Sequence, residues 1–287
     1  MSIGRPRRRF GNDDLIGDPD ASCGREGDEL AGGPGNDAID GRGNPADFPD
    51  SVEFDRALGP VTVDLIAGTA SGDGQDAVVN VEFVEGSRYA DRLTGPNASG
   101  DGGDDMLTID GGPEGLVTGL ASGDGGDDSI VVVEGATYVN STDGQGLQEF
   151  ADIVGGPGHD SIVLLEPPTD DRPAHVSGGS GRDRILGTAG QEWVDGGSGS
   201  DVIRTGGGAD SVFDAQGVFG PEGGDDRIYA GPGPDRIDAA DLVSGNDLVH
   251  GGDGVDVCTT DLETRSRRAS RSACWSAACV ILELCGS

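Results

Sequence analysis

Single apolar residues, separated by polar and glycine-rich stretches, recur at regular intervals along this chain of 287 residues. Between residues 178 and 213 an apolar side chain recurs at every ninth position, each time as the eighth residue of a unit whose first six residues are small or polar. Successive side chains of a strand point to opposite faces, so each such apolar residue would fill an interior. The pattern therefore predicts many short strands with their core positions at Ile185, Val194, Ile203 and Val212.

The stretches between these positions follow one motif, Gly-Gly-x-Gly-x-Asp-x-apolar-x. Strict copies are GGPGNDAID (32–40), GGPGHDSIV (155–163), GGSGRDRIL (178–186) and GGSGSDVIR (196–204), and GGDGVDVCT (251–259) differs only in Cys258. Adjoining or weaker copies are GTAGQEWVD (187–195), TGGGADSVF (205–213), PEGGDDRIY (221–229), AGPGPDRID (230–238), LVSGNDLVH (242–250), GDGGDDMLT (100–108), GDGGDDSIV (123–131) and RRFGNDDLI (8–16). Even with 54 glycines in the chain, chance does not produce four such units in frame.

The residue types of the motif suit a hard metal ion. Glycines at the first, second and fourth positions allow tight turns and leave carbonyl oxygens uncovered. The sixth-position Asp adds an anionic oxygen beside those carbonyls. Calcium takes six to eight such oxygens and accepts mixtures of carboxylate and carbonyl. Each repeat thus supplies half of a metal site and one core side chain, and neither half is stable unless the repeats stack.

These repeats resemble the RTX, or haemolysin-type, calcium-binding repeats. The resemblance covers roughly residues 8–40 and 100–259. It implies an all-β fold, a parallel β-roll or β-solenoid of stacked nonapeptides, in which two nonapeptides make one turn. It also implies several Ca²⁺ ions between adjacent glycine-rich loops, held by the sixth-position Asp and by main-chain carbonyls.

Carried over by position, the resemblance implies a set of carboxylate ligands and a set of loops. The carboxylates are Asp37, Asp105, Asp128, Asp160, Asp183, Asp201, Asp210, Asp226, Asp235, Asp247 and Asp256, with Asp13 the weakest further candidate. The carbonyl oxygens would come from loops near Gly33, Gly35, Gly156, Gly158, Gly179, Gly181, Gly197, Gly199, Gly208, Gly233, Gly252 and Gly254. Ordinary solvated acidic turns are the alternative interpretation of these positions.

The distribution of repeats predicts the organisation of the chain. The blocks are a partial repeat block (1–50), a β spacer (51–98), a degenerate repeat block (99–163), an insertion (164–177), the main roll (178–261) and a Cys/Arg-rich tail (262–287). Within the spacer, alternation predicts two strands, at 61–65 and 79–83, with no ligand role. Trp193 is expected to fill the core or an edge of the roll.

Composition narrows the function classes. The formal charge is −34, aromatic residues make up 4%, and the chain is close in composition to disordered chains. Bound calcium would reduce the self-repulsion, so we expect folding to be coupled to the metal. The acidity argues against nucleic acid, and no apolar stretch reaches the roughly 20 residues that a membrane span requires.

No sequence signature of catalysis is present, so we expect no enzyme. The chain contains no HExxH, no G-x-S-x-G and no lysine for a phosphate loop. Its acidic pairs are already explained as metal ligands.

The two ends depart from the RTX pattern. Cys258, Cys274, Cys279 and Cys285 cluster near one end, and Cys23 stands alone. A disulfide-stapled cap, free thiols and, less well, a zinc site are the interpretations. No apolar signal segment precedes the first repeat, so an export signal is not visible. A start codon placed too far downstream, or a frameshift near residue 260, would explain the two unusual ends. The tail is expected to be disordered or aberrant.

Together these observations predict a secreted, extracellular, non-enzymatic protein whose repeats fold on binding calcium. One alternative is an adhesive or structural surface protein that calcium stiffens and that grips a glycan or another cell. Another is the repeat module of a larger toxin or hydrolase. The repeats report the metal and leave the biological partner open.

Overall fold

The structure is a computed structural model that consists of two compact units. They are Met1–Ala151 (unit 1) and Asp152–Ser287 (unit 2). The described residues are 11–17, 27–42, 49–111, 116–117, 120–133, 137–138, 152–167, 173–213, 224–239, 247–260, 273–276 and 279–281. Over these ranges the chain forms strands and turns without a helix, which confirms the all-β fold class. No helix within them is long and apolar enough to cross a membrane.

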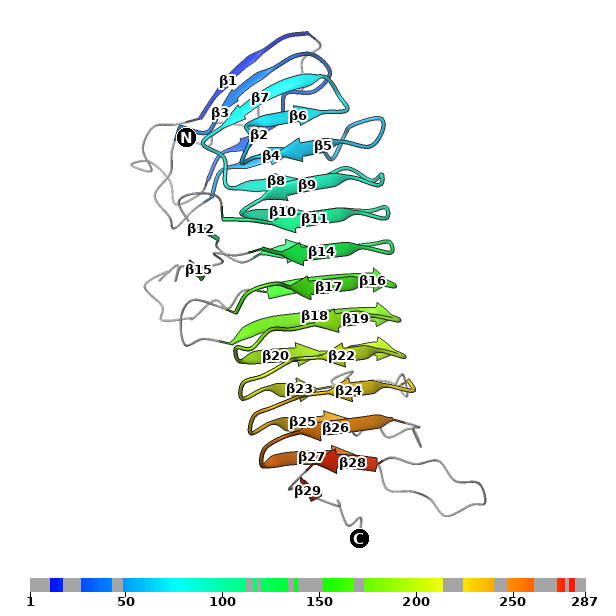
Figure 1. Cartoon of the computed structure of the whole chain (residues 1–287). Helices are drawn as coiled ribbons and strands as arrows, with labels where there is room; N and C mark the ends of the chain where they lie inside the picture. Colours follow the sequence, from blue (N-terminus) through cyan, green and yellow to red (C-terminus); the bar gives the residue numbers. More distant parts are fainter. Residues whose placement is uncertain are drawn as a thin grey trace. The chain divides into compact units, whose positions relative to one another are not determined.

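Unit 1 contains two sheets of short strands (Figure 1). The first has the order β1-β3-β7-β6-β5-β9-β11-β14, and the second β2-β4-β8-β10-β13. Pairing is parallel except at β6, which is antiparallel to β5 and β7. The bounds are β1 Asp14–Ile16, β2 Glu29–Leu30, β3 Ala38–Asp40, β4 Ser51–Glu53, β5 Thr62–Asp64, β6 Thr69–Ser71, β7 Gln75–Val79, β8 Phe83–Glu85, β9 Arg92–Gly95, β10 Asn97–Ser99, β11 Met106–Ile109, β13 Ala121–Ser122 and β14 Ser129–Val132, with the separate pair β12 Leu116–Val117 and β15 Thr137–Tyr138.

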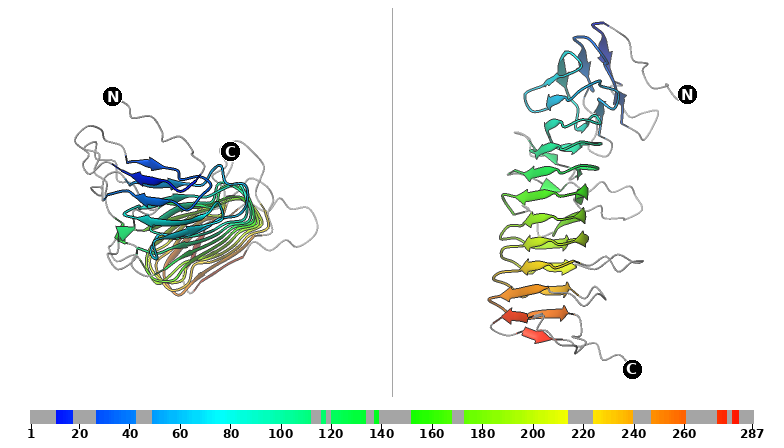
Figure 2. Two further views of the ribbon diagram at one scale, coloured as in Figure 1. Left: turned by 90° about the horizontal axis from the view of Figure 1, so that it is seen from above. Right: turned by 90° about the vertical axis from the view of Figure 1, so that its right-hand side faces the viewer.

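Unit 2 is the more regular of the two, and its strands stack in chain order (Figures 1 and 2). We call each strand, together with the turn before it, a rung. One sheet has the order β17-β19-β22-β24-β26-β28, and the other β16-β18-β20-β23-β25-β27-β29 with β21 paired to β18. The bounds are β16 Asp152–Gly158, β17 Ser161–Leu164, β18 Ala174–Gly181, β19 Arg184–Leu186, β20 Glu192–Asp195, β21 Ser198–Gly199, β22 Val202–Arg204, β23 Ser211–Phe213, β24 Arg227–Tyr229, β25 Arg236–Ala239, β26 Leu248–Gly252, β27 Asp256–Thr260, β28 Ala273–Ser276 and β29 Cys279–Ile281. The chain alternates between the sheets, so two nonapeptides make one turn of a β-roll.

The interior is a stack of equivalent apolar side chains, one from each rung. In one sheet of unit 2 the parallel register places Ile185 beside Ile203 and Ile203 beside Ile228. These three side chains are at most 1% exposed. Val194 and Val212 form the corresponding stack of the other sheet and are equally buried. The eighth-position residues thus form the core, as the nine-residue rhythm predicts.

The spacer is only partly as predicted. Strand β5 confirms the strand expected at 61–65, but a strand over 79–83 is wrong. Strand β7 ends at Val79, and Asn80 turns the chain with a φ of 54°. Strand β8 begins at Phe83 in the other sheet of unit 1. The alternation is interrupted because the chain changes sheets between these two strands.

The positions of Cys258 and Trp193 differ from those that their residue types predict. The Cys258 side chain is fully buried at the core position next to Ile237, and burial raises the pKa of its thiol to about 11. The expectation that Trp193 fills the core or an edge is wrong, because it lies outward on β20 and is 42% exposed. The disulfide and zinc interpretations of Cys23, Cys274, Cys279 and Cys285 fall on side chains outside the described part of the chain.

Candidate metal centres

The sixth-position carboxylates stand at the start of the strands, along the two edges of the roll. In unit 2, Asp183 and Asp201 precede β19 and β22 of one sheet, while Asp210 and Asp235 precede β23 and β25 of the other. Parallel pairing in register places equivalent residues of successive rungs side by side. The repeats therefore bring together, edge by edge, carboxylates that lie 18 to 25 residues apart in the sequence.

Main-chain hydrogen bonds link these carboxylates into what we call the carboxylate ladder. The amide N–H of each residue donates to Oδ1 of its counterpart in the next turn. On one edge of unit 2 the donor–acceptor distances are 2.8 Å (Asp160 to Asp183), 2.8 Å (Asp183 to Asp201), 2.7 Å (Asp201 to Asp226) and 3.0 Å (Asp226 to Asp247). On the other edge they are 3.0 Å (Asp210 to Asp235) and 3.1 Å (Asp235 to Asp256). One carboxylate oxygen of each acceptor is thereby used to hold the stack.

The second oxygen of these carboxylates has a different environment. Oδ2 is buried and has no hydrogen-bond partner among the described residues in Asp37, Asp105, Asp201, Asp210, Asp235 and Asp256. A buried, unsatisfied carboxylate oxygen costs free energy unless a donor or a cation reaches it. This oxygen is the observation that points to a ligand.

The glycine loops add main-chain oxygens to the same places. A Cβ on Gly178 would lie 2.5 Å from the carbonyl oxygen of Gly196 and 2.7 Å from Oδ2 of Asp183. A carbonyl of one turn and a carboxylate of its neighbour therefore converge beside the first glycine of the repeat. The described residues contain no group of three or more His, Cys, Asp or Glu side chains around one point. Mixed carbonyl and carboxylate oxygens are a donor set that fits calcium.

The close stacking of the loops explains the glycines at the second and fourth positions. Gly181 has a φ of 136° and Gly199 a φ of 124°. A Cβ on either would lie 1.5 Å from the carbonyl oxygen of the loop before it. Positive φ also holds for Gly33, Gly35, Gly156, Gly179, Gly197, Gly208, Gly233 and Gly252, and a Cβ on Gly254 would lie 1.7 Å from a carbonyl oxygen of Gly233. The turns thus leave no room for side chains where carbonyls face the next rung.

Burial and mutual repulsion raise the pKa values of three ladder carboxyls, Asp105, Asp201 and Asp235. Burial, with Asp183 and Asp226 nearby, raises the pKa of Asp201 to about 7. Burial raises the pKa of Asp105 to about 7 and that of Asp235 to about 6. The main-chain donors lower these values without cancelling the effect of burial. These three carboxyls therefore favour protonation when no cation is bound, and a bound cation would favour their charged form.

Unit 1 contains the same arrangement for the candidates predicted there. Asp13 donates its N–H to Oδ1 of Asp37 at 2.8 Å, and Asp105 donates to Asp128 at 2.8 Å. Asp37 and Asp128 are 3% and 2% exposed, whereas Asp13 is only half-buried. The structure therefore sets Asp13 at the margin of the ladder, where its amide takes part and its carboxylate accepts none of these bonds.

Four members of the ladder, Asp28, Asp50, Asp76 and Asp91, escaped the sequence analysis. Asp37 donates to Asp76 at 2.9 Å, Asp28 to Asp50 at 2.8 Å, and Asp91 to Asp105 at 2.7 Å. The expectation that the spacer has no ligand-type position did not foresee Asp76 and Asp91. The sequence signal was the second half of the motif alone, Asp-x-apolar, as in Asp76-Ala77-Val78. Without two leading glycines it is common turn chemistry.

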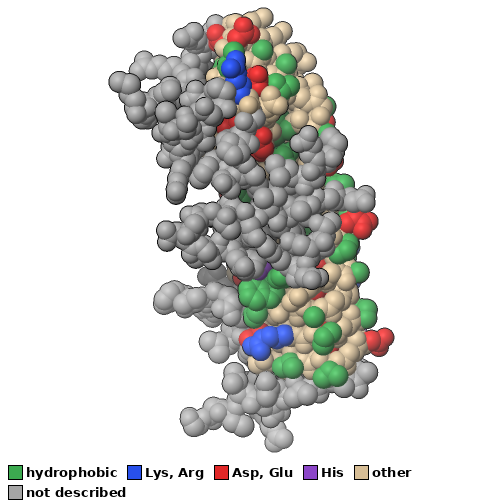
Figure 3. Space-filling view, turned by 90° about the vertical axis from the view of Figure 1, so that its left-hand side faces the viewer, with side chains coloured by type: hydrophobic (Ala, Val, Ile, Leu, Met, Phe, Trp, Pro, Cys, Tyr) green, Lys and Arg blue, Asp and Glu red, His purple; other side chains and the backbone are tan. Residues whose placement is uncertain are grey.

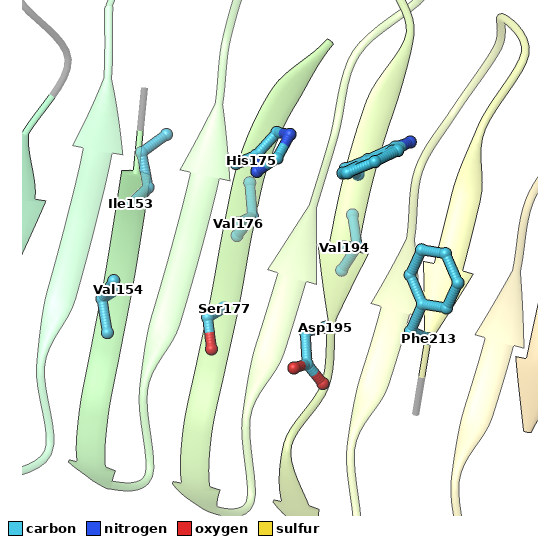
Figure 4. A pocket seen from close by; sticks show the side chains of 9 residues that line it. Ile153, Val154, His175, Val176, Ser177, Val194, Asp195 and Phe213 are labelled. Carbon is cyan, nitrogen blue, oxygen red and sulfur yellow. The ribbon is translucent and has the colours of Figure 1, made fainter. Parts of the chain in front are cut away.

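A groove in unit 2 is lined by residues of strands β16, β18, β20 and β23 (Figure 4). The rings of His175 and Trp193 lie 4.7 Å apart, and the Phe213 ring meets Trp193 edge-on at 6.1 Å. Ser177 and Asp195 line the same groove, and burial raises the pKa of the Asp195 carboxyl. Figure 3 shows hydrophobic side chains gathered next to a histidine on one face of the molecule.

Comparison with known proteins identifies the repeats. The model of the RTX calcium-binding nonapeptide repeat matches four copies, at residues 177–213, 222–241 and 244–262. The chain therefore contains RTX calcium-binding repeats in unit 2, and these imply calcium binding. A search of curated proteins found no match. The candidates Asp37, Asp105, Asp128 and Asp160 lie outside the matched residues and rest on the ladder geometry.

Proposed function

We propose that the chain is a secreted, non-enzymatic calcium-binding protein whose repeats complete their fold when calcium binds. The observation that carries this proposal is the second carboxylate oxygen of the ladder, buried and without a hydrogen-bond partner among the described residues. Leaving such a group unsatisfied costs about 1–3 kcal/mol, and more when it is charged. Repeated along the ladder, this cost opposes folding until a cation is present.

The residues that would hold calcium are the sixth-position carboxylates and the carbonyls of the glycine loops. When bound, calcium supplies positive charge between turns that otherwise repel each other. The Asp amides and Oδ1 atoms align the rungs, and Oδ2 remains directed toward the first glycine of its own repeat, as at Asp183 and Gly178. Stacked repeats contact chiefly their neighbours, so binding is expected to be cooperative along each ladder.

The net charge of the chain and the usual compartment of RTX proteins support the same function. A chain with a formal charge of −34 repels itself unless cations bind. Proteins with RTX repeats are generally secreted, and extracellular calcium modules bind with Kd of ~10⁻⁴–10⁻³ M. We expect affinities in that range, so that the chain is loosely structured at cytosolic calcium and rigid outside the cell. The ladder carboxylates are committed to stacking and ligation, which leaves them no acid–base role.

The test is a calcium titration of the full chain followed by far-UV circular dichroism, after treatment with chelator. We expect a cooperative gain of β signal with calcium and none with the same concentration of magnesium. A spectrum that is fully ordered in chelator and unchanged by calcium would contradict the proposal.

The groove favours a second function, adhesion of the calcium-loaded protein to a glycan. Trp193 offers an exposed ring on which the apolar face of a sugar can lie, and Asp195 and Ser177 can bond its hydroxyls. Binding to glycan arrays in calcium should be lost in Trp193→Ala. The matched control is Tyr89→Ala, which removes a comparably exposed aromatic ring (38%) from unit 1. Equal binding by both variants would exclude this groove.

A further inference from the structure

Two turns of the chain depart from the motif in the same way. The turn 86–91 (GSRYAD) has Ser87 at the second position, and the turn 187–192 (GTAGQE) has Thr188 there. The second position of the strict repeats is glycine. Both turns still end in a carboxylate, at Asp91 and Glu192, which are 4% and 0% exposed.

In the first of these turns the carboxylate is bound by its own turn. The Ser87 hydroxyl donates to Oδ1 of Asp91 at 2.9 Å, and the Ser87 amide donates to Oδ2 at 2.5 Å. The Tyr89 amide in turn donates to the Ser87 hydroxyl oxygen at 3.2 Å. Both carboxylate oxygens of Asp91 therefore have donors, unlike the Oδ2 atoms of Asp105 and Asp201.

The second turn repeats part of the arrangement with a threonine and a glutamate. Both of its donors reach Oε1 of Glu192, and Oε2 is buried without a hydrogen-bond partner among the described residues. The Thr188 hydroxyl donates to Oε1 of Glu192 at 2.5 Å, and the Thr188 amide donates to the same oxygen at 3.1 Å. The Gly190 amide donates to the Thr188 hydroxyl oxygen at 3.0 Å. Since the extra methylene of Glu192 extends its carboxylate, the hydroxyl and the carboxylate meet within the turn.

The backbone at the second position also differs. Second-position residues of other turns have positive φ, as in Gly179 (104°) and Gly197 (90°). Asp101 and Asp124 hold this position in the GDGGDD turns and keep positive φ, at 70° and 61°. Neither Ser87 nor Thr188 has positive φ. A side chain alone does not cause the difference, so the hydroxyl turns adopt a conformation of their own.

Both hydroxyl turns occupy the same place in a ladder, namely its first carboxylate. The residue before Asp91 in the stack is Val61, whose amide donates to Oδ1 of Asp91 at 2.7 Å. The residue that pairs with Glu192 on the preceding strand is Ala174. In each case the earlier rung offers no carboxylate at the sixth position. The hydroxyl is therefore found in the first turn of each of these ladders, where the preceding rung has no carboxylate to contribute to a metal site between the two rungs.

We propose that Ser87 and Thr188 close their turns by hydrogen bonds that need no calcium, and that these two turns form the metal-independent starts of the ladders that follow. The hydroxyl and the amide satisfy both oxygens of Asp91 and the Oε1 atom of Glu192. Asp105 then stacks on Asp91, and Asp210 stacks on Glu192, through amide-to-carboxylate bonds of 2.7 and 3.0 Å. In chelator, these turns would keep their hydrogen bonds while the glycine turns lose theirs.

The first experiment measures amide hydrogen exchange of the full chain in chelator. We expect the Gly190 and Tyr89 amides to exchange at least tenfold more slowly than the amides of the loops around Gly181 and Gly199. Thr188→Val should abolish the slow exchange at Gly190 and leave Tyr89 unchanged, and Ser87→Ala should do the reverse. The matched control is Thr108→Val, the same substitution on strand β11, which should alter neither amide. Retained slow exchange at Gly190 in Thr188→Val would overturn the proposal.

The second experiment counts bound ions and rests on the proposed function. Thr188→Gly combined with Glu192→Asp restores the motif as GGAGQD, beside the Thr205 carbonyl that a Cβ on Gly187 would meet at 2.5 Å. Calorimetric titration should show about one more calcium ion per chain than in the parent, with Thr188→Val showing no gain. An unchanged number would overturn the proposal. A parent that binds no calcium would refute the proposed function, while the exchange experiment would still decide whether the hydroxyls close the turns.

Discussion

The repeats at 178–213 and the spacer at 51–98 satisfy their buried carboxylates in two different ways. In the repeats, four nonapeptides in frame stack in parallel, and glycine carbonyls and Asp carboxylates meet between rungs. In the spacer the frame is broken, strand β6 runs antiparallel to β5 and β7, and Ser87 bonds Asp91 within its turn. The difference supports the proposal that the nine-residue frame makes folding depend on a cation. Where the frame is lost, ordinary hydrogen bonds satisfy the same groups.

Removal of calcium should separate the two regions most. In chelator we expect the glycine loops of 178–213, apart from the turn 187–192, to exchange their amide hydrogens near the rate of an unfolded chain, because the carboxylates of these loops repel each other and stay unsatisfied. Amides of the β5–β6–β7 segment should remain protected, since their bonds need no metal. Hydrogen exchange read by mass spectrometry checks both in one sample. Equal protection of the two regions would contradict the expected difference in their dependence on calcium.

A methyl group at a stacked glycine should have the next largest effect. Gly181→Ala places Cβ against a carbonyl oxygen at 1.5 Å and requires a φ of 136°, so we expect a loss of at least 3 kcal/mol of stability in calcium. Gly207→Ala is the control, because its nearest neighbour would be Pro232 at 3.5 Å. Denaturant unfolding in saturating calcium measures both. Similar losses would show that the loops are not closely stacked.

Deletion of a single carboxylate should have a moderate effect that depends on position. Asp201→Ala removes a fully buried member of the ladder, and we expect the calcium midpoint of folding to rise about tenfold, equivalent to about 1.4 kcal/mol. Asp13→Ala, at the margin of the ladder, should shift the midpoint less than twofold. The circular dichroism titration compares the two. Equal shifts would argue against stacked sites.

The smallest effect concerns pH, in the chain without calcium. The pKa of Asp201 is raised to about 7 in the fold from an ordinary value of 3.8, so the folded state binds the extra proton between these values. Stability of the calcium-free fold should therefore be greatest below about pH 4, fall as the pH rises to about 7, and then level off. The β signal in far-UV circular dichroism of the calcium-free chain at pH 4.5 and pH 7.5 measures this. A stronger β signal at pH 7.5 would contradict the burial of these carboxyls.

Much of this architecture can be predicted from the sequence because the repeat links chemistry to spacing. Ile185, Ile203 and Val212 are core residues by their position in the nonapeptide alone, and Asp183 and Asp201 are edge carboxylates for the same reason. Asp76 and Asp91 could not be assigned in this way. Their role follows from pairing with Asp37 and Asp105, partners 39 and 14 residues away, which no periodic rule connects.

Outward-facing residues were harder to predict than inward ones. The nonapeptide determines which side chain enters the core but places no constraint on its neighbours, so Trp193 was expected in the core or at an edge of the roll although it lies on the outer surface. The roles of Ser87 and Thr188 likewise depend on local contacts. A hydroxyl in place of a glycine reads as a degenerate repeat until its carboxylate partner is seen four residues on.

The hydrogen bonds of the ladder have a polarity, because the amide of each rung always donates forward to the carboxylate of the next. A defect should therefore be felt backward. Loss of the Asp201 carboxylate deprives the Asp183 amide of its acceptor, whereas the bond from Asp201 to Asp226 uses the Asp201 backbone and survives. Damage to one rung would thus spread toward the N-terminus. Unfolding would therefore have a direction even though the rungs are alike.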